Sequence, residues 1–304
     1  MRQLRHFLSL AEHCHFGRAA EACLITQSSL SASIKELEAV LGATLFERTK
    51  RSVMLTSLGQ GMVVMANDVV VKLDNLSEMA NSAGAPLTGR LRMGVIPTIG
   101  PFLLPRVLPG LRDKYPELQL YLREEKTHSL LRKLADGQLE LVLLALPYKT
   151  ERVEIFEFAI DPFLAIFPRG HRMGTFETLT PARFDKAALL ALEGENCLTD
   201  QILDVARAGE KILQDHFQAS SLHTLVQMVD NGLGVTIVPK MAIDGGILRG
   251  LRLEMRPFSS PNAHRRIALV WRRSSVRGNE YRLLGEILRD ELGTPMREAF
   301  LRDS

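Results

Sequence analysis

The chain has 304 residues, of which 46% are hydrophobic and 24% charged, and its formal net charge is +3. This length and composition suit two or three folded domains with an ample core. So small a net charge does not by itself indicate nucleic-acid binding, which means that any DNA-contacting surface has to be a local basic patch.

The N-terminus and the cysteines argue against several other classes. Residues 2–6 lead into an amphipathic pattern and not into the apolar run of a signal peptide. No apolar stretch reaches the roughly 18 to 20 residues that span a bilayer. The three cysteines are widely spaced, which is not typical of a secreted disulfide framework or of a metal site. We therefore expect a soluble, cytoplasmic protein without a metal or cofactor.

The first sixty residues predict a winged helix-turn-helix. Apolar spacing predicts helices over residues 4–11 and 16–23, and a third helix that begins after Thr26 or Ser28 and ends near Gly42. Two short strands around a basic turn are expected within residues 46–55. Three helices followed by a basic hairpin are typical of DNA-binding domains. The alternative is a small helical domain with an ordinary polar face. The inner face of the third helix is predicted to be Leu30, Ile34, Leu37 and Leu41.

The outer face of this third helix carries short hydrogen-bonding groups, and the turn carries positive charge. Short polar side chains can approach base edges and phosphates closely. A basic wing is suited to phosphates or to the minor groove. The predicted DNA-binding residues are Thr26, Gln27, Ser28, Ser31, Ser33, Lys35, Arg48, Lys50 and Arg51.

A long helix is expected to begin at Thr56 and Ser57 and to end in a polar linker at residues 81–86. Apolar residues recur along it at alternating steps of four and three, as in a heptad seam. Packing on its own domain would explain this stripe. A homodimer explains it better, because a two-fold protein matches a two-fold operator. The predicted dimerisation seam is Met62, Ala66, Val69, Leu73, Leu76 and Ala80.

From Arg90 onward, strands and helices alternate, which indicates a mainly parallel sheet. The first lobe is predicted to hold strands at 91–96, 118–122 and 139–146 and helices at 103–111 and 128–134. Strands at 153–160 and 162–167 then lead into a second α/β lobe. That lobe is predicted to hold strands at 188–192 and 235–238, the Cys197 segment, and a helix capped by Ser220 that reaches Val229. A strand at 266–271 and a helix at 280–292 return to the first lobe.

The predicted fold class is α/β, with a winged helix-turn-helix, a long linker helix and a bilobal regulatory domain of the periplasmic-binding-protein type. Such a fold places its ligand site in the cleft between the lobes. The expected domains are the head at 1–58, the linker and hinge at 59–88, and the regulatory domain at 89–304. Within the regulatory domain, lobe I is 89–161 and 266–304 and lobe II is 162–265.

Residues 16–51 resemble the LysR-type transcriptional regulators, and so does the bilobal domain. The resemblance is strongest to peroxide-sensing members of that family, through residues 96–105, 126–128, 196–201 and 216–222. It implies a double-stranded DNA operator as partner, dimers that pair into homotetramers, contact with RNA polymerase, and control of antioxidant genes. It also implies that Cys197 is the peroxidatic cysteine, with hydrogen peroxide as effector. The implied peroxide pocket is Thr98, Thr127, Thr199, Asp200 and His216.

The chemistry of these residues agrees with that role. A thiolate, not a thiol, attacks a peroxide oxygen, and the start of a helix stabilises an anion. Threonine hydroxyls can hold the peroxide, and Arg265 or Arg266 can stabilise the developing anion. The first product is a sulfenic acid.

One position departs from the family pattern. The resolving cysteine of the family lies nine residues after the peroxidatic one, where this chain has Ala206. Cys14 and Cys23 lie in the head, where we interpret them as packing residues. Either the chain is a one-cysteine sensor that switches by sulfenate, mixed disulfide or overoxidation, or Ala206 is a replacement of a resolving cysteine.

Two other functions remain open at this point. Thr98 follows a strand and precedes a helix, a position that commonly binds anions. This favours a LysR-type regulator of a small organic acid in which Cys197 is incidental. The third possibility is a one-cysteine thiol peroxidase, which would leave the head and the seam unexplained and is not the expected function. A periplasmic binding protein shares the bilobal fold but not the N-terminal head.

Overall fold

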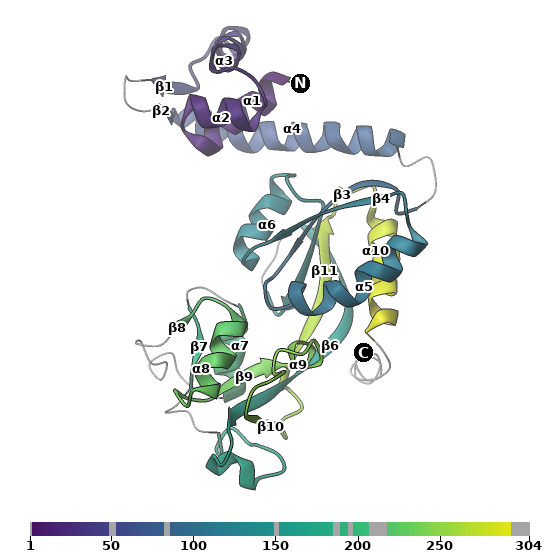
Figure 1. Ribbon diagram of the computed structural model, residues 1–304. Helices are drawn as coiled ribbons and strands as arrows, with labels where there is room; N and C mark the ends of the chain where they lie inside the picture. Colours follow the sequence, from purple (N-terminus) through teal and green to yellow (C-terminus); the bar gives the residue numbers. More distant parts are fainter. Residues whose placement is uncertain are drawn as a thin grey trace. The chain divides into compact units, whose positions relative to one another are not determined.

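The computed structural model describes residues 2–48, 53–81, 86–148, 152–184, 189–193, 197–206 and 218–292. The chain divides into two compact units, residues 1–83 and 84–304. Figure 1 shows a small helical unit at the N-terminus and a larger α/β unit that contains the rest of the chain. The long helix falls in the N-terminal unit, which we call the head.

The head is a winged helix-turn-helix, as predicted. Its elements are α1 (Arg2–His13), α2 (Phe16–Ala22), α3 (Gln27–Leu41), β1 (Phe46–Arg48), β2 (Val53–Leu55) and α4 (Ser57–Asn81). Phe7 and Leu10 of α1 are fully buried against Leu30 and Ile34 of α3. Strands β1 and β2 pair antiparallel as the two sides of the wing.

Local capping defines the ends of α3. The hydroxyl of Thr26 accepts a hydrogen bond from the amide of Ser29, which identifies Thr26 and not Ser28 as the N-cap. Gly42 ends the helix with a φ of 64°, the left-handed conformation that glycine adopts without strain. The prediction that Leu41 lies on the inner face was wrong. Its side chain is 43% exposed.

The larger unit, here called the regulatory unit, is built on one seven-stranded sheet. Its first strands are β3 (Gly89–Val95), β4 (Leu118–Glu124) and β5 (Leu141–Leu146), which pair in parallel in the order β4-β3-β5. Helices α5 (Gly100–Lys114) and α6 (Thr127–Ala135) connect them. Strand β11 (His264–Arg272) and helix α10 (Gly278–Glu291) return from the second lobe to the first, as predicted.

The second lobe continues the same sheet. Strand β6 (Val153–Pro168) pairs with β11 along its first part and with β9 (Thr236–Pro239) and β10 (Leu253–Pro257) along its last part. A short parallel pair, β7 (Ala191–Leu192) and β8 (Gln218–Ala219), lies beside helices α7 (Cys197–Ala206) and α8 (Leu222–Asp230). A 3₁₀ turn η1 (Arg172–Thr175) and helix α9 (Lys240–Asp244) complete the lobe. Figure 1 shows β6 and β11 running between the two lobes.

Two details differ from the predictions. Residues 153–160 and 162–167 form one continuous strand, because the pairing of β6 with β11 reaches Pro162 and its pairing with β9 begins at Phe163. The cap of α8 is Ser221 and not Ser220, since the Ser221 hydroxyl accepts from the amide of Thr224. Four short elements, η1, β8, α9 and β10, were not predicted from the sequence.

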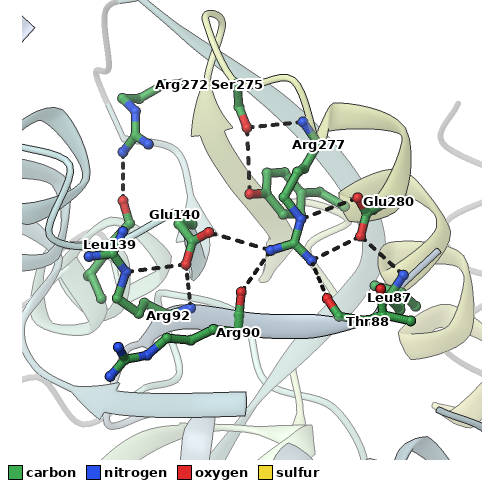
Figure 2. A network of polar contacts seen from close by, with 11 residues as sticks. Leu87, Thr88, Arg90, Arg92, Leu139, Glu140, Arg272, Ser275, Arg277 and Glu280 are labelled. Atoms are coloured by element: carbon green, nitrogen blue, oxygen red, sulfur yellow. Dashed lines mark hydrogen bonds and ion pairs between the residues drawn. The ribbon is translucent and has the colours of Figure 1, made fainter. Parts of the chain in front are cut away.

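A buried arginine cluster fastens the beginning of the regulatory unit to its end (Figure 2). Arg277 donates to the carbonyl oxygens of Thr88 and Arg90 and forms ion pairs with Glu280 and Glu140. Glu280 in turn accepts from the backbone amide of Leu87. Both Arg277 and Glu140 are almost completely buried. The cluster therefore fixes β3, the first strand of the regulatory unit, against α10.

Candidate functional site

Cys197 is the first residue of α7, and its side chain is half-buried. The hydroxyl of Thr127, the first residue of α6, donates a hydrogen bond to its sulfur over 3.5 Å. The two residues come from different lobes of the predicted domain. The helix start and the hydroxyl both favour negative charge on the sulfur. The structure therefore brings together two of the predicted site residues in an arrangement that suits a reactive thiolate.

Thr98 lies on the loop between β3 and α5 and is almost completely buried. Its hydroxyl accepts from Nη1 of Arg265 at 2.8 Å, and its carbonyl oxygen accepts from Nη2 at 2.9 Å. Arg265 is also buried, whereas Arg266 lies on the surface and pairs with Glu157. Of the two arginines that we considered, Arg265 is therefore the one that reaches the predicted pocket.

Asp161 completes this group, and its role was not predicted from the sequence. Its carboxylate is fully buried and forms an ion pair with Arg265 at 3.0 Å. The other carboxylate oxygen accepts from the backbone amide of Met241 at 2.8 Å. Complete burial raises the pKa of Asp161, while the charge of Arg265 and the Met241 amide oppose this rise. The only sequence signal was an aspartate inside an apolar strand.

The other predicted pocket residues have different surroundings. The Thr199 hydroxyl donates to the carbonyl oxygen of Leu192, which ties the first turn of α7 to β7. Asp200 is exposed in that same turn. His216 lies outside the described residues. Among the described residues, Thr127 donates a hydrogen bond to the sulfur, and the roles of Thr199, Asp200 and His216 stay predictions.

Gln201 is a second residue that the sequence analysis did not assign to the site. Its side-chain amide donates to the carbonyl oxygen of Leu146 at the end of β5, at 3.2 Å. Within the described part of the chain, its buried Oε1 has no hydrogen-bond partner. Gln201 and Cys197 lie one turn apart on α7, so this helix contacts the first lobe at two points. The signal for Gln201 was its place in the Cys197 motif.

Ala206 is the last residue of α7 and is fully buried in the core. Cys14 and Cys23 belong to the head, where each follows the end of a helix. Cys23 is the half-buried C-cap of α2. The Cys14 sulfur donates to the carbonyl oxygen of Ala11, but Cys14 is exposed, so the prediction that it is a packing residue was wrong. A helix end carries partial negative charge, which disfavours a thiolate. The surroundings of Cys197 therefore differ from those of both head cysteines.

The head places the predicted DNA-binding residues in three groups. Gln27, Ser28 and Lys35 are exposed, and Ser31 is half-buried. Thr26 is engaged as the cap of α3, Ser33 is bonded to Nδ1 of His6, and Arg48 pairs with Glu38. Lys50 and Arg51 lie outside the described residues.

Glu38, which the sequence analysis missed, holds the wing against α3. One carboxylate oxygen accepts from the backbone amides of Leu45 and Phe46, and the other pairs with Arg48 of β1. The Arg48 guanidinium also lies over the ring of Phe16. Arg48 therefore positions the wing, and the exposed residues of α3 form the accessible part of the candidate interface.

The predicted seam on α4 divides into two faces. Ala66 is buried in the head's own core, and Met62 packs against that core. Val69 and Leu76 are 44% and 61% exposed. The side chain of Ala80 lies outside the described ones, and Leu73 is half-buried. Exposed Leu58 and Met65 share the spacing of Val69 and Leu76, with steps of seven, four and seven.

Two further observations concern the described residues only. None of their helices is long and apolar enough to cross a membrane. No group of three or more histidine, cysteine, aspartate or glutamate side chains in the described ranges could hold a metal ion. A cavity of about 470 Å³ in the regulatory unit is lined by Pro162, Lys240 and His264 among others, and by none of the predicted pocket residues.

Two family models match the chain. The model described as "Bacterial regulatory helix-turn-helix protein, lysR family" matches residues 1–60. The model described as "LysR substrate binding domain" matches residues 84–293. Together they cover residues 1–60 of the head and nearly all of the regulatory unit.

Relatives and solved structures match over nearly the whole length. A probable hydrogen peroxide-inducible genes activator of Streptomyces viridosporus is 40% identical over 95% of this chain and 93% of its own. The DNA-binding transcriptional dual regulator OxyR of Escherichia coli K12 is 37% identical over 95% of this chain and 94% of its own. Full-length OxyR of Pseudomonas aeruginosa with a cysteine-to-aspartate substitution has a TM-score of 0.75 at 35% identity, and covers 94% and 96% of the two chains. A cysteine-to-serine variant of Corynebacterium glutamicum OxyR with bound H2O2 has a TM-score of 0.66 at 33% identity, and covers 99% and 93%.

Proposed function

Because the chain belongs to the LysR family of bacterial regulatory helix-turn-helix proteins, we propose that it senses hydrogen peroxide through oxidation of Cys197 and controls antioxidant genes. The observation that carries this proposal is the hydrogen bond from Thr127 to the Cys197 sulfur at the start of α7. The relatives named as peroxide-inducible activators and the H2O2-bound structure support the same effector.

The reaction converts the thiolate of Cys197 into a sulfenic acid. The sulfur attacks one peroxide oxygen, a sulfur–oxygen bond forms, and the oxygen–oxygen bond breaks. The sulfur is oxidised and the peroxide reduced, and the departing hydroxide takes a proton to become water. The Thr127 hydroxyl stabilises the attacking thiolate, since a hydrogen bond to a charged group is stronger than one to a neutral group.

Ala206 determines which reaction can follow the formation of the sulfenic acid at Cys197. Along an intact helix, nine residues at a rise of about 1.5 Å separate the two ends of α7 by about 13 Å. A disulfide needs Cα atoms within about 7 Å, so a partner cysteine at this position would require the helix to unwind. With a buried alanine there, α7 can remain folded. The signal then begins with the larger, polar sulfenic acid in a half-buried position, which disturbs the contacts of α7 with the first lobe.

The output is a change in how the heads bind a two-fold operator. The exposed stripe Leu58, Met65, Val69 and Leu76 supports a homodimer seam on α4. We leave Ala66 out of this proposed seam, because it is buried in the head's own core. We place the dimers in a homotetramer that contacts RNA polymerase, in the cytoplasm. The exposed groups of α3 then read the major groove.

The test is mass spectrometry of Cys197 after a brief pulse of dilute peroxide. We expect rapid addition of one oxygen at Cys197 while Cys14 and Cys23 stay reduced. The same spectrum distinguishes a sulfenic acid from a mixed disulfide or from further oxidation. Equal oxidation of all three cysteines would contradict the proposal and favour a regulator of an organic acid. Sustained peroxide consumption in the presence of a thiol reductant, without any change in DNA binding, would identify a thiol peroxidase instead.

A further inference from the structure

We propose that Asp161 is a positioning residue for the peroxide reaction. It fixes Arg265, and Arg265 in turn holds the hydroxyl of Thr98 as a hydrogen-bond donor toward the departing oxygen. This inference rests on the proposed function, because it concerns the same reaction at Cys197.

Asp161 and Arg265 lie opposite each other on the two strands that run between the lobes. Their Cα atoms are partners in the register of β6 and β11. Both carboxylate oxygens of Asp161 are occupied, one by Arg265 and the other by the amide of Met241 at the start of α9. The position of the carboxylate is therefore set by three elements of the fold, and it defines one edge of the guanidinium.

The two terminal nitrogens of the Arg265 guanidinium bond to Thr98, and Nη2 is shared with the Asp161 carboxylate at 3.0 Å. Nη1 donates to the hydroxyl oxygen and Nη2 to the carbonyl oxygen of the same residue. The planar, five-donor fork of arginine fits this geometry, which a lysine ammonium cannot reproduce. Because Asp161 binds one edge of the Arg265 guanidinium and Thr98 binds another, the orientation of the guanidinium is fixed.

The hydrogen bond from Arg265 determines what the Thr98 hydroxyl can do. A threonine hydroxyl has one proton to donate and two lone pairs to accept with. Because Arg265 donates to the oxygen, the Thr98 proton points to another acceptor. The positive charge next to the oxygen also polarises the O–H bond and strengthens it as a donor. Thr98 is therefore prepared to donate to an oxygen on which negative charge develops.

The sheet brings the Thr98 hydroxyl to the edge at which Thr127 contacts the Cys197 sulfur. Val95 and Glu124 are partners in the parallel pair of β3 and β4. Thr98 and Thr127 follow these partners at the same spacing. The carboxyl ends of parallel strands meet at one edge of a sheet, so the two hydroxyls lie at that edge. Thr127 then serves the attacking sulfur, and Thr98 serves the departing oxygen.

A second buried ion pair provides the matched control. Glu140 and Arg277 are almost as deeply buried as Asp161 and Arg265, and they lie in the same unit. The donors of Arg277 end on carbonyl and carboxylate oxygens, with no hydroxyl among the partners that Figure 2 draws for its guanidinium. Glu140→Gln therefore measures what the loss of a buried carboxylate does to the fold without altering a donor at the reaction site.

The test compares two reactions of Cys197 in the full-length protein. The rate of sulfenic acid formation with hydrogen peroxide needs a donor for the departing oxygen, whereas alkylation by iodoacetamide needs only an accessible thiolate. For Asp161→Asn we expect the peroxide rate to fall about tenfold or more, because a correctly aimed donor is lost. The alkylation rate should stay within about twofold, since Thr127 still stabilises the thiolate. Glu140→Gln should change neither rate.

The Thr98→Val variant tests whether the effect of Asp161→Asn on the peroxide rate depends on the Thr98 hydroxyl. If Asp161 acts through Thr98, adding Asp161→Asn to Thr98→Val should slow the peroxide reaction little further. Asp161→Glu keeps the charge but displaces the carboxylate, so it should lower the peroxide rate in the same direction and less strongly.

Several outcomes would overturn the inference. These are an unchanged peroxide rate in folded Asp161→Asn, an equal loss in both reactions, or fully additive effects with Thr98→Val. Failure of both Asp161 variants to fold while Glu140→Gln folds would assign the pair to stability alone. A wild-type Cys197 that reacts with peroxide no faster than Cys14 would overturn the proposed function itself. A reactive wild type with an unaffected Asp161→Asn would overturn this inference only.

Discussion

The two units place their candidate functional groups in opposite surroundings. In the head, Gln27 and Ser28 stand exposed on α3 above a core of apolar side chains. In the regulatory unit, Thr98, Thr127 and Arg265 are each at most 5% exposed. A surface that reads DNA has to be accessible, whereas a donor for a peroxide acts more strongly where water is excluded.

This difference has an energetic consequence. Substituting an exposed residue of α3 changes binding with little effect on the free energy of unfolding. Substituting a buried hydrogen-bonded group changes chemistry and stability together, because its partner is left without a bond. A substitution in the regulatory unit therefore needs a matched variant that controls for loss of stability. In the head, such a control is needed only for substitutions of helix-capping residues.

The largest expected effect is at Cys197. Cys197→Ser should retain operator binding and lose the peroxide response completely, because a serine hydroxyl is not oxidised by peroxide. Cys14→Ser and Cys23→Ser should keep the response, since both thiols lie at helix C-termini. The measurement is operator binding by fluorescence anisotropy before and after a peroxide pulse. An unchanged response in Cys197→Ser would contradict the redox mechanism.

A smaller effect is expected at Thr127. Thr127→Val removes the hydroxyl that donates to the Cys197 sulfur and keeps the shape of the side chain. A hydrogen bond to a charged group contributes roughly 1.5 to 3 kcal/mol, so the rate of Cys197 oxidation should fall about tenfold to a hundredfold. Stopped-flow measurement with peroxide tests this. Thr127→Ser retains the hydroxyl and should restore most of the rate, and a rate loss of equal size in both variants would mean that packing is responsible.

The architecture was largely readable from the sequence. Period-3.6 stripes located α1, α3 and α4, and the alternation of apolar strands and helices located β3 to β5 with α5 and α6. The continuity of β6 was not readable, because Pro162 looks like a strand boundary until its pairing with β11 is known. One residue of the predicted seam, Ala66, was also wrong. Ala66 and Val69 fit one stripe, but the tertiary fold buries the first and exposes the second.

The site was readable only where it forms a local motif. Cys197 and Thr127 were found through short segments that resemble a known family, and the structure places them in contact. Asp161 carries no such signal. Its role depends on being opposite Arg265 in the register of two strands about a hundred residues apart in sequence, which no local pattern encodes.

The head offers an effect of intermediate size that separates binding from stability. Gln27→Ala and Ser28→Ala remove exposed polar groups of α3 and should each weaken operator binding by about 1 kcal/mol, or about fivefold. Their melting temperatures should not change. Thr26→Ala removes the cap of α3, so it should lower the stability by about 1 kcal/mol in addition to weakening binding. Anisotropy titrations and thermal unfolding of the same samples test both, and a lowered melting temperature in Ser28→Ala would show that its hydroxyl has a structural role.

The smallest effect concerns His6, a partly buried titratable group in the head. Nδ1 of His6 is hydrogen-bonded to the Ser33 hydroxyl at 2.7 Å. Partial burial and the nearby charge of Arg2 lower the pKa of His6 below its usual value of 6.5. In the unfolded chain His6 therefore takes up a proton at a higher pH than in the folded head. As the pH falls through the usual value, the unfolded state gains a proton that the folded state resists, and the head loses stability. Below the lowered pKa both states are protonated and the loss stops.

The expected result is a modest fall in the melting temperature of the head transition between about pH 8 and pH 5, with a shallower dependence in His6→Gln. Glutamine can still bond to Ser33 and does not titrate, so any slope that remains belongs to other groups. If His6→Gln shows the same slope as the wild type, the pH dependence does not come from His6. The pH dependence of the stability of the head would then have to come from titratable groups other than His6.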